Sequence, residues 1–286
     1  MTQRFVFVVA GLTLLFAKPL YDLVQLALNV DLHSHTLLIP FVSIYFAWLL
    51  REELPKPTRP NHKLALAFGI LGLVALAYYW FGPGFTAAED SIATILLAYI
   101  LFINAVALYL FGANVARAQS FSLAFLVFLL PMPIFVQYWA NTFFQYTSAE
   151  VSYHMVRMAD ISIYRYHPLT FELPTIELHV APSCSGIRSS LVLLITSIVA
   201  GKLFLTTRWK RWALILFIVP LAIVRNGFRI FTISYLCVHE GPHMVDHWIH
   251  HKGGPFFFAL SLIPFFAFLW WLWRGEQASA KRQDLD

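Results

Sequence analysis

A cysteine among small and polar residues stands at the start of a long apolar segment. Residues 181–190 have the sequence APSCSGIRSS, and the apolar run 191–195 follows at once. A membrane helix needs no thiol at its start, and an arginine there costs free energy. The N-terminus of a helix favours the thiolate form of cysteine, which is the nucleophilic form. We therefore predict that Cys184 is a nucleophile held at the outer mouth of a membrane helix.

Three arginines fall inside apolar segments, where an arginine costs about 2.5–3.5 kcal/mol and usually faces a polar interior. Arg188 lies one turn below Cys184 and is either an interfacial anchor or a support for the thiol. Arg225 and Arg229 lie four residues apart on one helix face, with Asn226 between them. Because the apolar segments hold almost no acidic residue, we predict that Arg229 shares a polar cavity with Cys184. Arg225 lies deeper, and a structural role is the alternative for it.

Histidines are concentrated in the loop 237–255. They are His239, His243, His247, His250 and His251. The i, i+4 spacing of His243 and His247 would suit a zinc site if this loop were helical. The loop has no H-E-x-x-H pattern, and glycine and proline interrupt it, so we predict no metal site. His250 and His251 directly precede the last apolar segment, and this returns them to the membrane face on which the thiol must lie.

The composition indicates a membrane protein. The chain has 286 residues, of which 59% are hydrophobic and 12% are charged, whereas soluble domains are about 45–50% apolar and about 25% charged. The formal charge of +5 is not a nucleic-acid signal, because the basic residues fall in loops between apolar runs. The two cysteines lie far apart in the sequence and form no disulfide framework. We expect a lipid bilayer as surroundings and no nucleic-acid partner.

The apolar runs predict an all-α polytopic membrane protein with about eight transmembrane helices in a single domain, 1–286. The predicted spans are residues 4–22, 36–50, 64–81, 92–112, 121–138, 186–205, 212–236 and 256–273. About 20 residues cross the hydrocarbon layer, so each run is long enough, or nearly so. Residues 139–159 between the fifth and sixth spans predict an amphipathic helix.

The pattern changes to alternation before the sixth span. Residues 161–167 and 175–180 alternate between apolar and polar side chains, and Leu173-Pro174 interrupts the stretch between them. Alternation with a turn signal predicts one or two short β-hairpins. We therefore predict an external hairpin insert at about residues 160–183.

Basic residues give the orientation of the spans. With eight spans, most basic residues of the loops and ends fall on one side, including those of the tail 275–286. The other side keeps Lys18, Arg157, Arg165 and Lys252. Because basic loops stay in the cytoplasm, both termini are predicted to be cytoplasmic. Cys184, the hairpin region and the loop 237–255 are then all on the outer face.

Three short runs, in this order along the chain, resemble the exosortase/archaeosortase family. They are CSGIRSS at 184–190, NGFR at 226–229, and a histidine followed by glycine before the last span. DLHSH at 31–35 and LPMP at 130–133 are also similar to that family, and the likeness covers about residues 20–273. The resemblance implies a membrane cysteine protease or transpeptidase. Its substrates would be membrane-anchored proteins with a C-terminal sorting signal (the PEP-CTERM type in bacteria).

The resemblance also implies roles for individual residues. The family's Cys, Arg and His correspond to Cys184, Arg229 and His250. The chain has Gly254-Pro255 where the family usually has Gly-Trp, so His251 stays open as the alternative. A histidine at this third position is typical of the bacterial branch, which implies the bacterial inner membrane. No cofactor is implied.

The chemistry of such a set is coherent. The Cys184 thiolate would attack the scissile carbonyl and form a thioester, with Arg229 stabilising the thiolate or the oxyanion. His250 would carry the proton to the leaving amine. Two other functions remain open at this point: a transporter with an arginine-lined polar cavity, and a metal-dependent membrane hydrolase that uses the histidines of 239–251.

Overall fold

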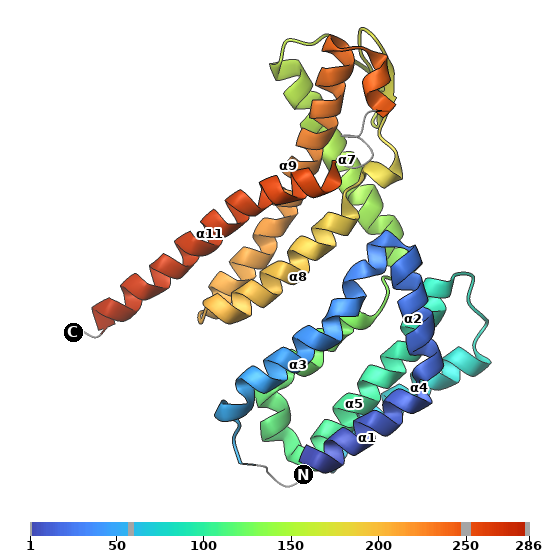
Figure 1. The fold of residues 1–286 in the computed structure, drawn as a ribbon, viewed down its shortest axis with the longest axis vertical. Helices are drawn as coiled ribbons and strands as arrows, with labels where there is room; N and C mark the ends of the chain where they lie inside the picture. Colours follow the sequence, from blue (N-terminus) through green and yellow to red (C-terminus); the bar gives the residue numbers. More distant parts are fainter. Residues whose placement is uncertain (1, 57–59, 247–252, 284–286) are drawn as a thin grey trace. The chain divides into compact units, whose positions relative to one another are not determined.

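The computed structural model of the chain describes residues 2–56, 60–246 and 253–283. These residues form two compact units, Met1–Gln137 and Tyr138–Asp286 (Figure 1). Helices dominate both units, and a small antiparallel sheet belongs to the second.

The first unit is entirely helical in its described part. Its elements are α1 (Thr2–Leu15), α2 (Ala17–Asn29), η1 (Asp31–Leu38), α3 (Ile39–Leu49), η2 (Leu50–Glu53), α4 (His62–Phe81), α5 (Ala88–Ala118), α6 (Ser120–Phe125) and η3 (Leu126–Leu129). Helices α4 and α5 pack closely, because Gly72 leaves room for the ring of Phe102. The Thr13 hydroxyl lies 2.8 Å from that of Tyr99 and joins α1 to α5.

The first predicted span, 4–22, is bent rather than straight. Helices α1 and α2 meet at an angle of 70°. In a continuous helix the ring of Pro19 would clash with the carbonyl of Leu15, four residues earlier. Helix α1 ends at Leu15, and Pro19 then lies in the first turn of α2. Backbone N–H groups in the first turn of a helix have no acceptor within that helix, so a proline there removes no helical hydrogen bond.

The fifth predicted span, 121–138, is broken as well. The helical part of this stretch ends at Leu129, and α7 (Ile134–Met158) begins after Pro131 and Pro133. Leu130 is extended (φ −68°, ψ 127°), as expected for the residue before a proline. Helix α7 therefore unites the end of the predicted span with the amphipathic helix predicted at 139–159.

In the described part of the chain, six helices are long and apolar enough to cross a membrane. The number rises to eight if each bent pair counts as one span. The prediction of an all-α polytopic membrane protein with about eight transmembrane helices is thus confirmed.

The second unit combines helices with the sheet. Its elements are most of α7, then β1 (Tyr164–His167), β2 (Thr170–Glu172), β3 (Glu177–His179), η4 (Pro182–Cys184), α8 (Ile187–Phe204), α9 (Arg208–His239), η5 (Pro242–Asp246) and α11 (Gly254–Gln283). Helices α8, α9 and α11 pack together around Leu193, Leu214 and Phe265, which are fully buried (Figure 1).

The predicted hairpin region is a three-stranded antiparallel sheet of order β1-β2-β3. The middle strand β2 was not predicted as a separate strand, because its three residues are too few to show an alternating pattern. Phe171 of β2 is fully buried, and it packs with Ala149 of α7, Val180 and Ile230 of α9. The sheet is therefore seated on α7 and α9 by an apolar core.

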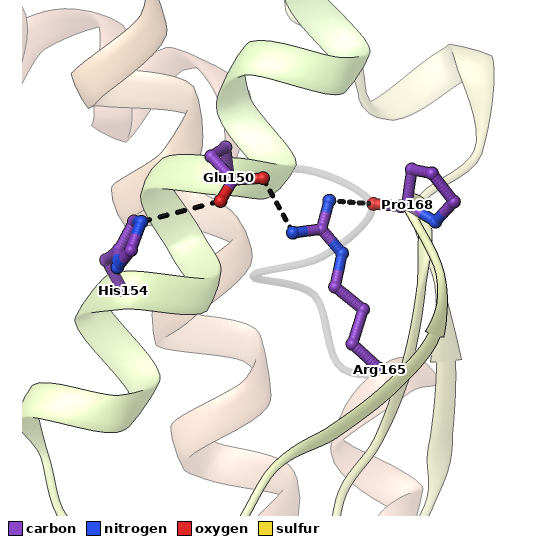
Figure 2. A network of polar contacts seen from close by, with 4 residues as sticks. All are labelled: Glu150, His154, Arg165 and Pro168. Atoms are coloured by element: carbon purple, nitrogen blue, oxygen red, sulfur yellow. Dashed lines mark hydrogen bonds and ion pairs between the residues drawn. The ribbon is translucent and has the colours of Figure 1, made fainter.

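An ion pair also fixes the sheet to α7, as Figure 2 shows. Arg165 of β1 donates from Nη1 to Glu150 Oε2 over 2.6 Å and from Nη2 to the Pro168 carbonyl over 2.7 Å. On the other side of the carboxylate, His154 Nε2 lies 3.4 Å from Glu150 Oε1. The Arg165 guanidinium lies 5.4 Å from the centre of the Tyr153 ring. One side chain thus joins the first strand, its turn and the helix beneath.

Candidate functional site

Cys184 lies on a tight turn that links the sheet to a membrane helix. The chain leaves β3, passes through the 3₁₀ turn η4, and enters α8 at Ile187. The Cys184 N–H donates to the Ala181 carbonyl over 2.9 Å and closes the turn. The thiol residue is half-buried. It therefore sits, as predicted, immediately before the N-terminus of an apolar helix long enough to cross the membrane.

Gly186 gives this turn its shape. The residue caps α8 in the left-handed region (φ 72°, ψ 15°), which glycine adopts at little cost. A Cβ on this residue would lie 2.8 Å from Asn226 Oδ1 and 3.1 Å from Arg225 Nη2. Both the backbone conformation and the close approach of α9 therefore require glycine.

Two neighbouring side chains of α9 hold the turn in place. Asn226 is 2% exposed and donates from Nδ2 to the Cys184 carbonyl over 2.6 Å. Arg225 is 8% exposed and donates from Nη2 to the Gly186 carbonyl and to Ser190 Oγ, both over 3.1 Å. The NGFR run and the cysteine run, distant in sequence, are thus joined by direct hydrogen bonds.

Helix α7 supports the same turn from another side. Ser185 is 1% exposed, and its hydroxyl donates to Asn141 Oδ1 over 2.6 Å. The close packing of α7 against α9 depends on Gly227, where a Cβ would lie 2.7 Å from Val151 Cγ1. The Cys184 carbonyl and the two residues that follow it are therefore anchored to α7 and α9, while Cys184 stays half-buried.

Cys184 lines a pocket of about 200 Å³. Its walls are formed by Ile176, Glu177, Leu178, His179, Val180, Ala181, Cys184, Ile230, Ile233 and Val245. The lining is mostly apolar and combines β3, the turn, α9 and η5. A residue that lines such a pocket can meet a molecule bound in it.

His179 is a titratable residue of this pocket that the sequence analysis did not single out. It lies on β3, five residues before Cys184, and its Nδ1 lies 3.1 Å from the Thr170 hydroxyl on β2. The alternating pattern of residues 175–180 was the available signal, because it placed a histidine on the last strand before the thiol. Only the pocket shows that both residues share one space.

The other predicted site residues are not among the described residues that line the pocket. Arg229 is half-buried and directly precedes Ile230, which lines the pocket. The described residues that form the pocket do not include Arg229. Arg188 is exposed on the first turn of α8. His250 and His251 lie outside the described residues, so a meeting of Cys184, Arg229 and a histidine stays a prediction.

Within the described residues, no three His, Cys, Asp or Glu side chains are grouped as a metal site would require. His239 stacks on the Tyr235 ring at 4.1 Å and its Nδ1 lies 2.9 Å from the Tyr235 carbonyl. His243 is exposed on η5. The remaining histidines of the loop, from His247 onward, lie outside the described part.

A comparison with models of protein families matches residues 28–267 to the transmembrane exosortase family. The chain belongs to this family. The match contains both the cysteine run and the NGFR run, so the resemblance found in the sequence is confirmed. As an exosortase, the chain is a multi-pass membrane protein, and the family implies a membrane peptidase or transpeptidase that acts on sorting-signal substrates. The comparisons with curated proteins and with solved structures found no match.

Proposed function

We propose that this exosortase is a cysteine-type peptidase or transpeptidase. It cleaves C-terminal sorting signals of the PEP-CTERM type from exported, membrane-anchored proteins. One observation carries the proposal: Cys184 lines a pocket at the junction between the small sheet and the N-terminus of α8. A scissile bond just outside a substrate's membrane helix would reach a thiol at this level.

The reaction proceeds by acyl transfer. The Cys184 thiolate attacks the scissile carbonyl, the peptide C–N bond breaks, and the released amine takes up a proton. His250, or His251 in its place, delivers that proton, and Arg229 stabilises the negative charge on the thiolate or on the carbonyl oxygen. An amine or water then attacks the thioester and returns the thiol.

The neighbouring polar residues position the nucleophile. Asn226 fixes the Cys184 carbonyl, and Arg225 fixes the Gly186 carbonyl at the start of α8. With these two carbonyls held, the backbone of the turn cannot move away from the pocket without breaking hydrogen bonds to buried side chains of α9. Arg188, exposed in the first turn of α8, supports the site from the membrane interface.

The proposed location combines the family resemblance with the loop charges. We propose the bacterial inner membrane, as the resemblance to the bacterial branch implies, with both termini in the cytoplasm and the pocket facing the exterior. The rule that basic loops stay in the cytoplasm supports this orientation. The enzyme needs no metal or other cofactor in this mechanism.

A matched pair of cysteine variants tests the function. The probe is a reporter ending in a short motif, an apolar helix and an arginine cluster, taken from a protein that the same genome encodes. We expect Cys184→Ala to abolish its processing. Cys237→Ala changes the other cysteine, which is fully buried in α9, and should leave processing intact. A folded Cys184→Ala protein that still cleaves the reporter would contradict the proposal.

A further inference from the structure

Strand β3 lies at the edge of the sheet, because the strand order is β1-β2-β3. Its pairing with β2 shows which backbone groups face outward. Val180 N–H donates to the Leu169 carbonyl, and Leu173 N–H donates to the Ile176 carbonyl. In an antiparallel ladder, residues that bond to the partner alternate with residues whose N–H and C=O point away. The backbone groups of Glu177 and His179 therefore point to the outer edge.

The outer edge of β3 has unused hydrogen-bonding capacity. In the described part of the chain, no hydrogen bond engages the backbone N–H or C=O of Glu177 or His179 beyond the sheet itself. Both residues are exposed. Such an edge is a template for another strand unless the protein blocks it, and here neither a proline nor a bulge interrupts β3.

The pocket runs along this edge. Successive side chains of a strand point to opposite faces, so a pocket above one face would touch every second residue. The pocket beside Cys184 is lined by six consecutive residues, 176–181. The pocket therefore follows the edge of the strand, where it is also lined by Ile230, Ile233 and Val245. Cys184, which follows residues 176–181 along the chain and precedes α8, lines the same groove.

We propose that the extended segment preceding a substrate's membrane helix binds as a fourth strand on the outer edge of β3. This inference rests on the proposed function and adds how the substrate is recognised. Backbone hydrogen bonds to Glu177 and His179 would hold the segment, whatever its side chains, and the apolar wall formed by α9 and η5 would select an uncharged side chain. The groove then delivers the following peptide bond to Cys184.

The direction of the added strand follows from the membrane. From β3 the chain proceeds through Cys184 into α8, which is long and apolar enough to cross the bilayer. The substrate also runs from an exported domain into a membrane helix, so both chains approach the membrane in the same sense. The added strand is therefore parallel to β3, with the scissile bond beyond His179.

A proline at the outer edge tests the backbone contact. His179→Pro removes the outward N–H, and proline is tolerated on an edge strand when its N–H would face outward. His179→Ala removes the same side chain but keeps the N–H. Using a reporter that the wild-type protein processes, we expect His179→Pro to be about tenfold slower than His179→Ala, as the loss of one well-made hydrogen bond predicts. Equal rates in two variants with the same unfolding temperature would overturn the inference.

Cross-linking tests the geometry without relying on turnover. Glu177→Cys and His179→Cys are each placed in a Cys184→Ala background and combined with reporters that carry single cysteines upstream of the membrane helix. The parallel arrangement predicts that His179→Cys cross-links about two residues nearer the membrane helix than Glu177→Cys does. The reverse order, or no cross-link at either position, would overturn the inference.

The two proposals fail in different ways. If Cys184→Ala abolishes processing but neither the proline effect nor the cross-link pattern is found, the edge-strand inference falls and the cysteine mechanism stands. If Cys184→Ala still processes the reporter while the cross-link pattern is present, the cysteine mechanism falls and substrate binding at β3 stands.

Discussion

The amide of Asn226 donates a 2.6 Å hydrogen bond to the backbone carbonyl of Cys184. This contact joins a residue deep in α9 to the turn that carries the thiol. The NGFR run contains the support, and the CSG run contains the turn that it supports. The same geometry requires Gly186 beside the amide oxygen.

Replacing Asn226 by aspartate tests the support directly. Asn226→Asp exchanges the donor for a carboxylate that opposes the Cys184 carbonyl, in a position that is 2% exposed. We expect a loss of about 1–3 kcal/mol in stability, since the Cys184 carbonyl would lose its donor and the new carboxylate would be buried. Processing should also fall. Asn104→Ala is the control, because within the described residues the Asn104 side chain bonds to the Ile100 carbonyl of its own helix and to no other group. Wild-type processing and thermal unfolding in Asn226→Asp would contradict this role.

Gly186→Ala adds only one methyl group, but we expect it to destabilise the protein strongly. The alanine would be held at a φ of 72° and its Cβ would meet the Asn226 side chain. A non-glycine residue in this region costs about 1–2 kcal/mol before any clash is counted. Gly69→Ala provides the comparison, because a Cβ there has nothing within 4 Å. Thermal unfolding in detergent should fall for position 186 and stay level or rise for position 69. Equal shifts would refute the assigned conformation.

Arg225 and Arg229 should respond differently to truncation. Arg225 bonds to the Gly186 carbonyl and to Ser190 Oγ, so Arg225→Ala should lower the unfolding temperature together with processing, at a cost of about 1.5–3 kcal/mol. Arg229→Ala should reduce processing with a smaller change in unfolding, if its charge serves the reaction. The pair of measurements separates the two roles. Unchanged unfolding in Arg225→Ala would be the contrary result.

The Arg165–Glu150 pair should contribute less than its short distance suggests. Glu150 remains about half-exposed, so Glu150→Gln should cost about 0.2–1 kcal/mol, as for other surface ion pairs. Arg165→Ala should cost more, because it also removes the bond to Pro168 and the contact with the Tyr153 ring. Hydrogen exchange of the β2 amides measures both effects. A larger loss of protection in Glu150→Gln than in Arg165→Ala would contradict this ranking.

Much of the fold was predictable because long apolar runs must be helical in a membrane. The helix breaks were harder to place. Pro19 lies within an apolar run, and only the end of α1 at Leu15 shows where the bend occurs. Strand β2 has three residues, too few for a periodic signal. Hydropathy locates the membrane segments, but it does not show how far the helix axis bends where a proline interrupts a segment.

The site was predictable from the types of its residues, and its contacts were not. Cys184 and Asn226 could be predicted as site residues from the sequence. A thiol at the start of an apolar segment is unexpected, and so is an asparagine between two arginines inside one. The hydrogen bonds of Arg225 depend on how α8 and α9 pack, which no local pattern encodes. His179 and the outward edge of β3 became visible only from the register of the strands and from the pocket that follows them.

The most direct test of the central claim is to trap the acyl-enzyme. The detergent-purified protein is mixed with the reporter, quenched in acid, and analysed by mass spectrometry before and after hydroxylamine treatment. The mechanism predicts an acyl adduct on the peptide that contains Cys184, released by hydroxylamine and absent from Cys184→Ala. Cleavage of the reporter with no such adduct, and with full activity in Cys184→Ala, would contradict it.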